Sequence, residues 1–162
     1  ENADKFGYKY ICVPPQMFND QIISSTLIRK LLKEGNILLA NRLLGTNFML
    51  EGTVIRGAQL GRTIGFPTAN IKYTPEIVQI PFGVYSARVN NRPAVLNWGM
   101  KPTVHNTKEP IVEVHIINFD GDLYGKNIEI EITSKIRDEK KFRGLEELRT
   151  QIEKDVKECL KL

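Results

Sequence analysis

Between residues 48 and 133, short apolar segments alternate with turns that are rich in Gly, Pro and Asn. The segments with the length and composition of β-strands are Phe48–Arg56, Val84–Val89, Ala94–Trp98, Val112–Phe119 and Ile128–Thr133. Short strands at this spacing predict a small antiparallel barrel or sandwich. We favour the barrel, because closure leaves no unpaired sheet edge. The last two segments are predicted to pair with each other across the Asp120–Gly125 turn.

Helical patterns flank the β segments. Residues 24–45 predict two short helices, the first with Ser24 among its cap candidates and Gly35 at its end, the second capped by Asn36 and closed by Gly45. A helix-turn-helix DNA reader is one interpretation of this pair. The second helix is mostly apolar and lacks a base-reading face, so packing is the favoured role.

Residues 145–162 predict a longer helix at the end of the chain. One apolar stripe runs along it, formed by Leu145, Leu148, Ile152, Val156 and Leu160. We expect this helix to pack against the outside of the barrel.

The first residues, 1–23, fit neither pattern. Tyr8–Val13 predicts a short strand that stops at Pro14 and Pro15, and no nearby segment offers it a strand partner. We interpret this stretch as the end of a preceding domain.

Length and composition are those of one soluble globular domain with an appendage. The chain has 162 residues, of which 41% are hydrophobic and 26% are charged. Its formal charge of +4 favours an anionic ligand such as a nucleotide, and equally suits weak RNA contacts. One functional interpretation is therefore a non-catalytic β-barrel that binds nucleic acid. It is less favoured, since the basic residues form no dominant run and the aromatic residues are scattered near turns.

The two cysteines, Cys12 and Cys159, form no CxxC motif and no disulfide framework. This usage is consistent with a reducing, cytoplasmic setting. No segment approaches the roughly 20 apolar residues that a membrane-spanning helix needs. The first residues also lack the apolar core of a signal peptide.

The loop after the first strand is the main candidate for a ligand site. Gly57, Gly61 and Gly65 recur at intervals of four, and their backbone amides could form an anion-binding concavity. A hairpin with a glycine-rich turn is the alternative interpretation. The loop closes with Phe66–Asn70, the sequence FPTAN, in which proline holds the following residues in a stiff segment.

Thr68 and Asn70 carry the oxygen atoms of this segment. Magnesium prefers oxygen ligands and keeps waters and substrate phosphates in its shell, so one or two protein oxygens suffice. These two side chains could supply them, with the nucleotide phosphates bringing the negative charge. An ordinary turn stabilised by the same side chains is the alternative.

The strand sequence Val112–Ile116, VEVHI, is the second candidate. Alternation places Glu113 and His115 on one face and the apolar residues on the other. Glu113 could act as a general base, or it could be a charge on the solvated face of the sheet. His115 is interpreted as structural, and a structural zinc site is disfavoured because His105 and His115 are the only histidines.

The charged segment 136–142, IRDEKKF, predicts a loop before the last helix. Charge runs are usually solvated. Alternatively, Arg137 and Phe142 close over a planar, partly apolar substrate by stacking and hydrogen bonding.

Taken together, these motifs resemble the riboflavin kinase module of bacterial bifunctional riboflavin kinase/FAD synthetases. The matching pieces, which cover nearly all of residues 46–162, are GTVIRGAQLGRTIGFPTAN, NWGMKPTV (97–104), VEVHIINFDGDLYGK (112–126) and IRDEKKF followed by LEELRTQIEKDV. The segment ISSTLIR (23–29) resembles the nucleotide-binding motif that ends the adenylyltransferase module of the same proteins.

The resemblance implies a mainly β fold, a six-stranded antiparallel Greek-key barrel with a C-terminal helix, preceded by a short helical connector. It implies transfer of the γ-phosphate of ATP to the terminal ribityl hydroxyl of riboflavin, with Mg²⁺, giving FMN and ADP. The residues carried over are Thr68 and Asn70 for the metal and phosphates; Gly57, Gly61, Arg62 and Pro67 for the nucleotide; Glu113 as catalytic base; and Arg137, Glu139 and Phe142 for the flavin.

The resemblance also divides the chain. Residues 1–45 would be the remnant of the FMN adenylyltransferase module with the connector, and residues 46–162 the complete kinase domain. The full-length parent would also convert FMN to FAD and contact the kinase domain through the missing module. This chain should not make FAD, because an α/β nucleotidyltransferase cannot fit into about 45 residues.

Three departures from the family pattern give further expectations. Leu27 stands where arginine is common, which weakens the inference about adenylylation. Arg143 and Gly144 stand where an Asp-Ser cap is common, so the last helix should begin less firmly. Trp98 occupies a position that often has a smaller residue.

Overall fold

The computed structural model describes residues 2–9, 11–102 and 108–161. The helices are α1 (Asn2–Phe6), α2 (Ser25–Lys33), α3 (Ile37–Leu44), α4 (Leu60–Thr63) and α5 (Leu145–Cys159). The strands are β1 (Met17–Phe18), β2 (Gln21–Ile22), β3 (Phe48–Ile55), β4 (Ala69–Tyr73), β5 (Gly83–Val89), β6 (Arg92–Pro102), β7 (Lys108–Ile116) and β8 (Asn127–Asp138). His105 and the last two residues of the NWGMKPTV motif lie outside the described residues.

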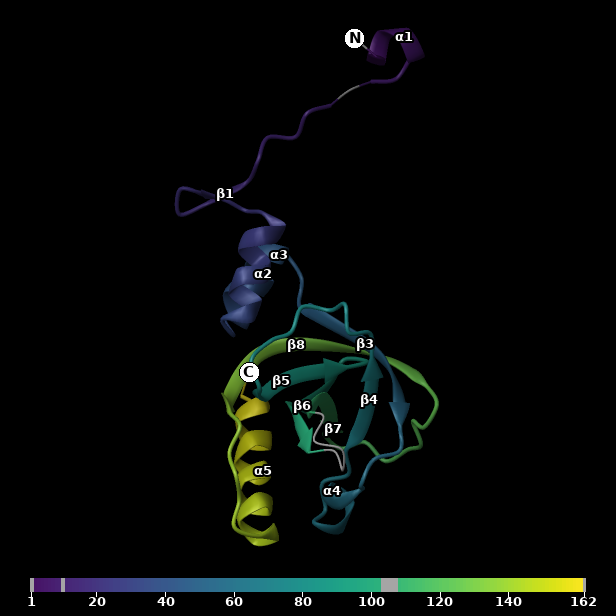
Figure 1. Ribbon diagram of the computed structural model, residues 1–162, viewed down its shortest axis with the longest axis vertical. Helices are drawn as coiled ribbons and strands as arrows, with labels where there is room; N and C mark the ends of the chain where they lie inside the picture. Colours follow the sequence, from purple (N-terminus) through teal and green to yellow (C-terminus); the bar gives the residue numbers. More distant parts are fainter. Residues whose placement is uncertain (1, 10, 103–107, 162) are drawn as a thin grey trace.

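Strands β3 to β8 close into one antiparallel barrel in the order β3-β4-β7-β6-β5-β8 (Figure 1). Within it, β5, β6 and β7 are sequential neighbours, and β8 returns to lie beside β5. This is the Greek-key arrangement, in which the fourth strand returns beside the first. The prediction of a six-stranded antiparallel barrel with a C-terminal helix is confirmed.

Three details of the strand prediction are wrong. The segments on either side of the Asp120–Gly125 turn do not pair, since β7 lies between β4 and β6 while β8 lies between β3 and β5. The strand β4, five residues directly after the stiff FPT segment, was not predicted. Residues 136–138, predicted as part of a loop, belong to β8, where Arg137 and Asp138 pair with Val84 and Gly83 of β5. Because β4 occupies the edge of β7 that a hairpin would need, residues 117–126 cross to a different place in the barrel.

The barrel interior is filled by alternating side chains of these strands. Along β3 every second residue is buried, beginning with Phe48. Trp98 and Tyr85 are the largest fully buried side chains, and the Trp98 ring packs against Tyr73 with ring centroids 5.3 Å apart. The departure at position 98 is therefore accommodated in the core of the barrel.

Helices α2 and α3 pack on the barrel and extend its core. Leu32 and Ile37 are almost fully buried and belong to the same apolar cluster as the strands. The Asn41 side chain joins three elements, since its Nδ2 donates to the Ile132 carbonyl of β8 at 2.9 Å and its Oδ1 accepts from the Phe48 amide of β3 at 2.8 Å. Both predicted helices and the packing role are confirmed, and Ser24 caps α2, but the Asn36 side chain makes no cap bond at the start of α3.

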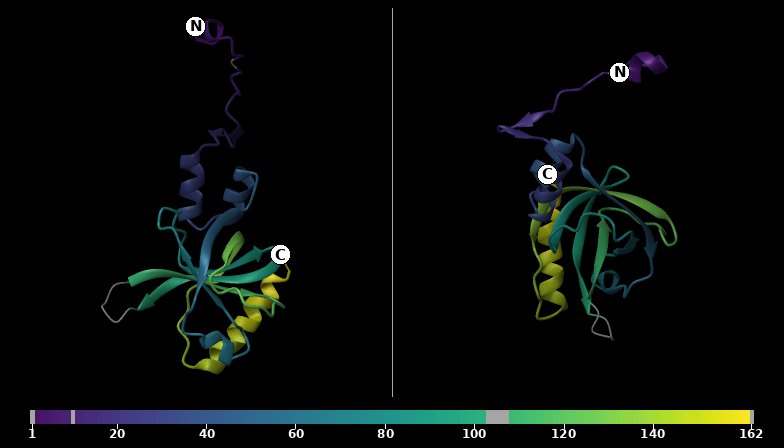
Figure 2. Two further views of the ribbon diagram at one scale, coloured as in Figure 1. Left: turned by 90° about the vertical axis from the view of Figure 1, so that its right-hand side faces the viewer. Right: turned by 45° about the horizontal axis from the view of Figure 1, so that its top comes forward.

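The residues before α2 project away from the barrel (Figures 1 and 2). The prediction of a strand over Tyr8–Val13 is wrong, because its described residues are not in a strand. The chain instead forms the two-residue strands β1 and β2, which pair only with each other. A strand needs a partner, and the barrel is already closed. No helix in the described part of the chain is long and apolar enough to cross a membrane.

Helix α5 lies along the outside of β5, β6 and β8, as predicted. Its N-cap, Gly144, makes no side-chain cap bond, and the Glu147 carboxylate instead accepts the Arg143 amide at 2.9 Å. The deepest residues of α5 are Asp155 and Cys159, whereas Leu145 and Leu160, the ends of the predicted stripe, are exposed.

Candidate active site

The predicted base and the PTAN segment are neighbours in the sheet. Asn70 of β4 and Asn97 of β6 lie directly opposite Glu113 of β7, one on each side. Cβ atoms of directly opposed residues in antiparallel strands are about 4.5–5.5 Å apart. Val112 and Val114 point into the core, so this row of three polar side chains lies on the outer surface of the barrel. The predicted alternation along β7 is confirmed.

Two glycines of the loop are needed because other atoms occupy the space of a side chain. A Cβ on Gly57 would lie less than 3.0 Å from the side-chain amide of Asn70, and a Cβ on Gly61 would overlap the Phe66 carbonyl oxygen. The Phe66 amide donates to the Gly61 carbonyl at 2.8 Å, which closes the loop around α4. These glycines thus set the position of PTAN, and their predicted contact with a nucleotide stays a prediction.

His115 fixes the other side of the same segment. Its Nδ1 hydrogen-bonds with the Pro67 carbonyl at 2.8 Å, and its ring meets the edge of Phe66 with centroids 5.4 Å apart. This contact agrees with the structural role expected for His115. Thr68 follows directly and is held between this anchor and the start of β4.

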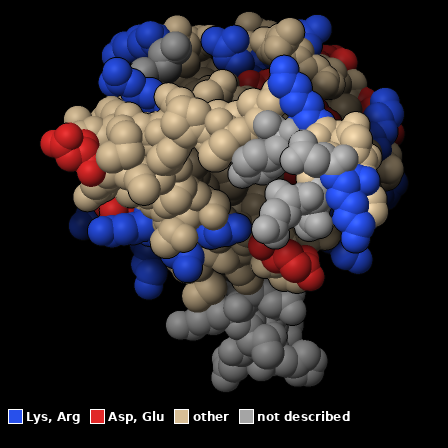
Figure 3. Space-filling model, turned by 90° about the horizontal axis from the view of Figure 1, so that it is seen from above, with Lys and Arg blue, Asp and Glu red and all other residues tan. Residues whose placement is uncertain are grey.

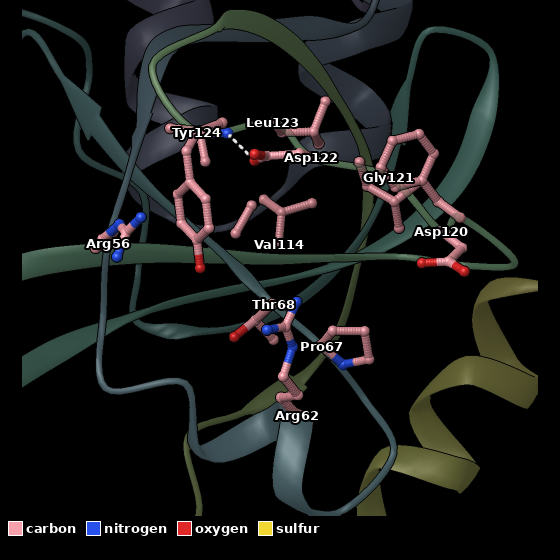
Figure 4. Close-up of a pocket in the computed structure, with 14 residues that line it drawn as sticks. Arg56, Arg62, Pro67, Thr68, Val114, Asp120, Gly121, Asp122, Leu123 and Tyr124 are labelled. Atoms are coloured by element: carbon pink, nitrogen blue, oxygen red, sulfur yellow. Dashed lines mark hydrogen bonds between the residues drawn. The ribbon is translucent and has the colours of Figure 1, made fainter.

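A cavity of about 530 Å³ opens on one side of Thr68 (Figure 4). It is lined by residues from the β3 end, the glycine loop, β7 and the 119–124 segment: Val54, Arg56, Arg62, Pro67, Thr68, Ala69, Val114, Ile116, Phe119, Asp120, Gly121, Asp122, Leu123 and Tyr124. We call it the loop cavity. The predicted nucleotide residues Arg62 and Pro67 lie here.

Tyr124 is held in the loop cavity by three contacts. The Arg56 guanidinium lies 5.2 Å from its ring centroid, Gln59 Nε2 donates to its hydroxyl at 3.2 Å, and its amide donates to Asp122 Oδ1 at 2.9 Å. Phe119 was predicted to end a strand and residues 120–125 to form a turn, so none of these residues was predicted to line a site. The FDGDLYG motif within the family resemblance was the available signal.

A second cavity, of about 210 Å³, opens on the other side of Thr68, between the α4 loop, β7 and α5. We call it the helix cavity. Its lining includes Gly61, Phe66, Thr68, Asn97, Glu113, His115, Arg137, Glu139, Lys140, Phe142, Leu148, Ile152 and Asp155. It therefore brings Glu113 together with all three predicted flavin residues. Figure 2 shows α4 and α5 on the same side of the barrel.

Arg137 makes contacts in the helix cavity that the sequence did not predict. Its guanidinium forms an ion pair with Asp155 of α5, at 2.8 Å from Nη2 to Oδ2, and Nη1 donates to the Asp138 carbonyl at 2.9 Å. Its Cζ lies 5.8 Å from the ring centroid of Phe142. Asp155 was missed because an acidic residue on a helix is usually solvated. Its spacing of seven from Leu148, on the buried face, was the available signal.

Comparison with known proteins identifies the family. The family model of riboflavin kinases (flavokinases) matches residues 44–162. The chain belongs to the riboflavin kinase family. It is 43% identical over 148 residues to the bifunctional riboflavin kinase/FMN adenylyltransferase of Bacillus subtilis (strain 168), covering 88% of this chain and 47% of that protein.

A second curated relative and a solved structure are also similar to this chain. The Buchnera aphidicola (Acyrthosiphon pisum, strain APS) protein of the same name is 43% identical over 162 residues, covering 94% of this chain and 51% of its own. A crystal structure from Streptococcus pneumoniae, named as a macrolide-efflux protein, superposes with a TM-score of 0.82 at 32% identity, covering 96% of this chain and 52% of that one. The chain thus spans about half the length of the curated relatives that it matches.

Nothing in these comparisons supports the alternative of a nucleic-acid-binding barrel. On the face seen in Figure 3, Lys and Arg are spread around the edge and are not gathered into one patch. A nucleic-acid surface requires such a patch.

Proposed function

We propose that this chain transfers the γ-phosphate of ATP to riboflavin, giving FMN and ADP. The observation that carries the proposal is the position of Thr68, which lines both cavities. Thr68 is also two residues before Asn70, which lies opposite Glu113 in the sheet. A phosphoryl transfer needs two substrates whose reacting ends meet at one point. Membership of the riboflavin kinase family supplies the identity of the substrates.

In this proposal the loop cavity holds ATP. Its volume of about 530 Å³ suits a small-molecule ligand. Arg56 and Arg62 provide positive charge, and Tyr124 provides an aromatic surface. The phosphates then point toward Thr68, at the junction with the second cavity.

The helix cavity holds the flavin in this proposal, with the ribityl end toward Glu113. Its volume of about 210 Å³ is below the range of about 300–1,000 Å³ that is usual for small-molecule sites. We therefore expect residues 139–142, which follow the end of β8, to move outward when riboflavin binds, while Arg137 stays paired within the barrel. Phe142 and the apolar side chains of Leu148 and Ile152 would contact the ring system.

The chemistry follows from these positions. Glu113 orients the terminal ribityl hydroxyl and accepts its proton as the oxygen attacks the γ-phosphorus. The bond between that phosphorus and the bridging oxygen of ADP breaks, and ADP leaves. The Thr68 hydroxyl and the Asn70 amide oxygen fit the hard oxygen donors that Mg²⁺ prefers, with Asn70 seated against Gly57. When bound, magnesium would neutralise part of the phosphate charge.

The test is an incubation of the purified chain with riboflavin, ATP and Mg²⁺, with FMN and ADP measured by chromatography. We expect FMN and ADP in equal amounts. Folded protein that binds neither substrate and forms no FMN would contradict the proposal.

We also propose that residues 1–45 are the end of an adenylyltransferase module with its connector. The relatives are bifunctional, and this chain spans about half of them. The projecting N-terminal residues expose Phe6, Ile11 and Val13, which suits packing against a preceding module. The parent would convert FMN to FAD, whereas this chain should stop at FMN. FAD formation by this chain from FMN and ATP would contradict the proposal.

The proposed setting is reducing and cytoplasmic. Cys12 is exposed and Cys159 is buried, and both are free thiols. An exposed free thiol fits that compartment.

A further inference from the structure

A buried carboxylate lies on the helix that covers the barrel. The Asp155 side chain is 3% exposed, and its partner Arg137, at the end of β8, is 20% exposed. Arg137 Nε donates to both carboxylate oxygens, at 2.9 and 3.1 Å, and Nη2 donates to Oδ2 at 2.8 Å. Gln151 Nε2 also donates to Oδ1 at 2.9 Å. A charge in such a place is tolerated only when it is paired and hydrogen-bonded.

The hydrogen bonds leave the Arg137 guanidinium only one orientation. Nε and Nη2 are bound to Asp155, and Nη1 donates to the Asp138 carbonyl at 2.9 Å. In that orientation the guanidinium lies 5.8 Å from the centroid of the Phe142 ring, within the range of a cation–π contact. Asp155 is thus linked through Arg137 to the aromatic side chain at the end of the 137–142 segment.

The Arg137–Asp155 pair differs in its location from an ordinary surface ion pair on α5. Arg137, Asp155 and Phe142 all line the helix cavity with Glu113. The Arg149–Glu153 pair, one turn away, is 54% and 47% exposed and lines none of the cavities described above. Exposed pairs of that kind contribute little to stability.

We propose that Asp155 is a positioning residue for the flavin subsite, a role that rests on the proposed function. By fixing Arg137 at the end of β8, it sets the point from which residues 139–142 reach over the cavity and the cation against which the Phe142 ring packs. Helix α5 is then part of the substrate site as well as a cover for the barrel. Asp155 itself need not touch riboflavin.

The test compares Asp155→Asn with Glu153→Gln, a matched loss of one carboxylate on the exposed face of the same helix. KM for riboflavin, KM for ATP and kcat are measured for both variants and the unaltered chain. We expect Asp155→Asn to raise KM for riboflavin roughly 10-fold. This matches the lower end of the loss in affinity or activity that follows removal of a residue that orients a metal ligand. KM for ATP should stay within about twofold, and Glu153→Gln should match the unaltered chain.

A purely structural role gives a different result. Partial unfolding lowers the amount of active enzyme, and hence the apparent kcat, without changing KM for riboflavin. An unchanged KM for riboflavin in Asp155→Asn would therefore overturn the proposal, while absence of FMN formation by the unaltered chain would instead overturn the proposed function.

Arg137→Lys covers the case in which Asp155→Asn does not fold. It keeps a cation opposite the buried carboxylate but loses the planar fork that fixes the orientation. We expect its KM for riboflavin to rise with KM for ATP unchanged. The double variant Arg137→Lys/Asp155→Asn should be no worse in KM than the worse single variant, because the two residues act as one unit. Full additivity of the two effects would contradict the link.

Discussion

The loop cavity and the helix cavity meet at Thr68 but are built in different ways. The loop cavity is closed between two loops, because Arg56 and Gln59, which follow β3, contact Tyr124 of the 119–124 segment. The helix cavity is closed between a strand and a helix, above all by the ion pair between Arg137 of β8 and Asp155 of α5. Its volume is also less than half as large, about 210 Å³ against 530 Å³.

This difference indicates how each cavity should respond to change. The loop cavity already has the size of a ligand site, so a substitution there should alter one contact and one substrate affinity. The helix cavity depends on how α5 is joined to the 137–142 segment, so a distant residue can alter it. Substitution of Thr68, where the two cavities meet, should affect the binding of both substrates.

The largest effect is expected for Glu113→Gln, which acts on the chemical step. The amide keeps the size of the side chain but cannot accept the proton, so kcat should fall by about 10²- to 10⁴-fold. Binding of Mg-ADP, measured by calorimetry, should change less than twofold, because the loop cavity is untouched. A loss of nucleotide affinity as large as the loss of rate would contradict the role of Glu113 as base.

A smaller but shared effect is expected for Thr68→Ala. Since Thr68 lines both cavities, kcat should fall by roughly 10- to 100-fold, and the Mg²⁺ concentration needed for half-maximal rate should rise. Thr68→Ser, which retains the hydroxyl, is the matched control and should keep most of the activity. Equal losses in the two variants would show that the methyl group, and not the oxygen, matters at this junction.

Arg56→Ala should affect one substrate only. Loss of a cation–π contact worth about 0.5–2 kcal/mol should raise KM for ATP by roughly 2- to 30-fold. KM for riboflavin should not change, because Arg56 lines the loop cavity and not the helix cavity. A comparable rise in both KM values would mean that the two cavities are not separate subsites.

The smallest effect is expected for the hydrogen bond between Glu147 and the Arg143 amide at the start of α5, which should weaken at low pH. The backbone hydrogen bond from Arg143, followed by the hydrogen bond from Lys140, lowers the pKa of Glu147 below its ordinary value of 4.5. The contribution of Glu147 to stability is therefore fully present above pH 4.5 and is lost as the pH falls through the lowered pKa. Amide exchange at Arg143 should lose its protection in that window, and Glu147→Gln should abolish this pH dependence. Protection that persists at lower pH would contradict the capping role.

Much of the barrel could be predicted because its determinants are local. Alternation along β7 placed Glu113 on the outer face and Val112 and Val114 in the core, as observed. The pairing of β7 with β4 could not be deduced in the same way. Alternation indicates which face a residue occupies, but it does not say which strand lies alongside.

The residues of the site were likewise predicted only in part. The PTAN and VEVH motifs indicated Thr68, Asn70 and Glu113, and the register places Asn70 opposite Glu113. Asp155 could not be found from its neighbours, since a carboxylate on a helix is usually exposed. Its burial depends on Arg137, which is 18 residues earlier in the chain and reaches it only in the folded barrel.

The most direct test of the two-cavity account is an NMR titration of the ¹⁵N-labelled chain, first with Mg-ADP and then with riboflavin. Mg-ADP should shift the amides of residues 119–124 and Arg56, whereas riboflavin should shift residues 137–142 and the buried face of α5. Thr68 should respond to both ligands. Shifts by both ligands across residues 119–124 or across residues 137–142, or a response to riboflavin at 119–124 with none at 137–142, would contradict the account.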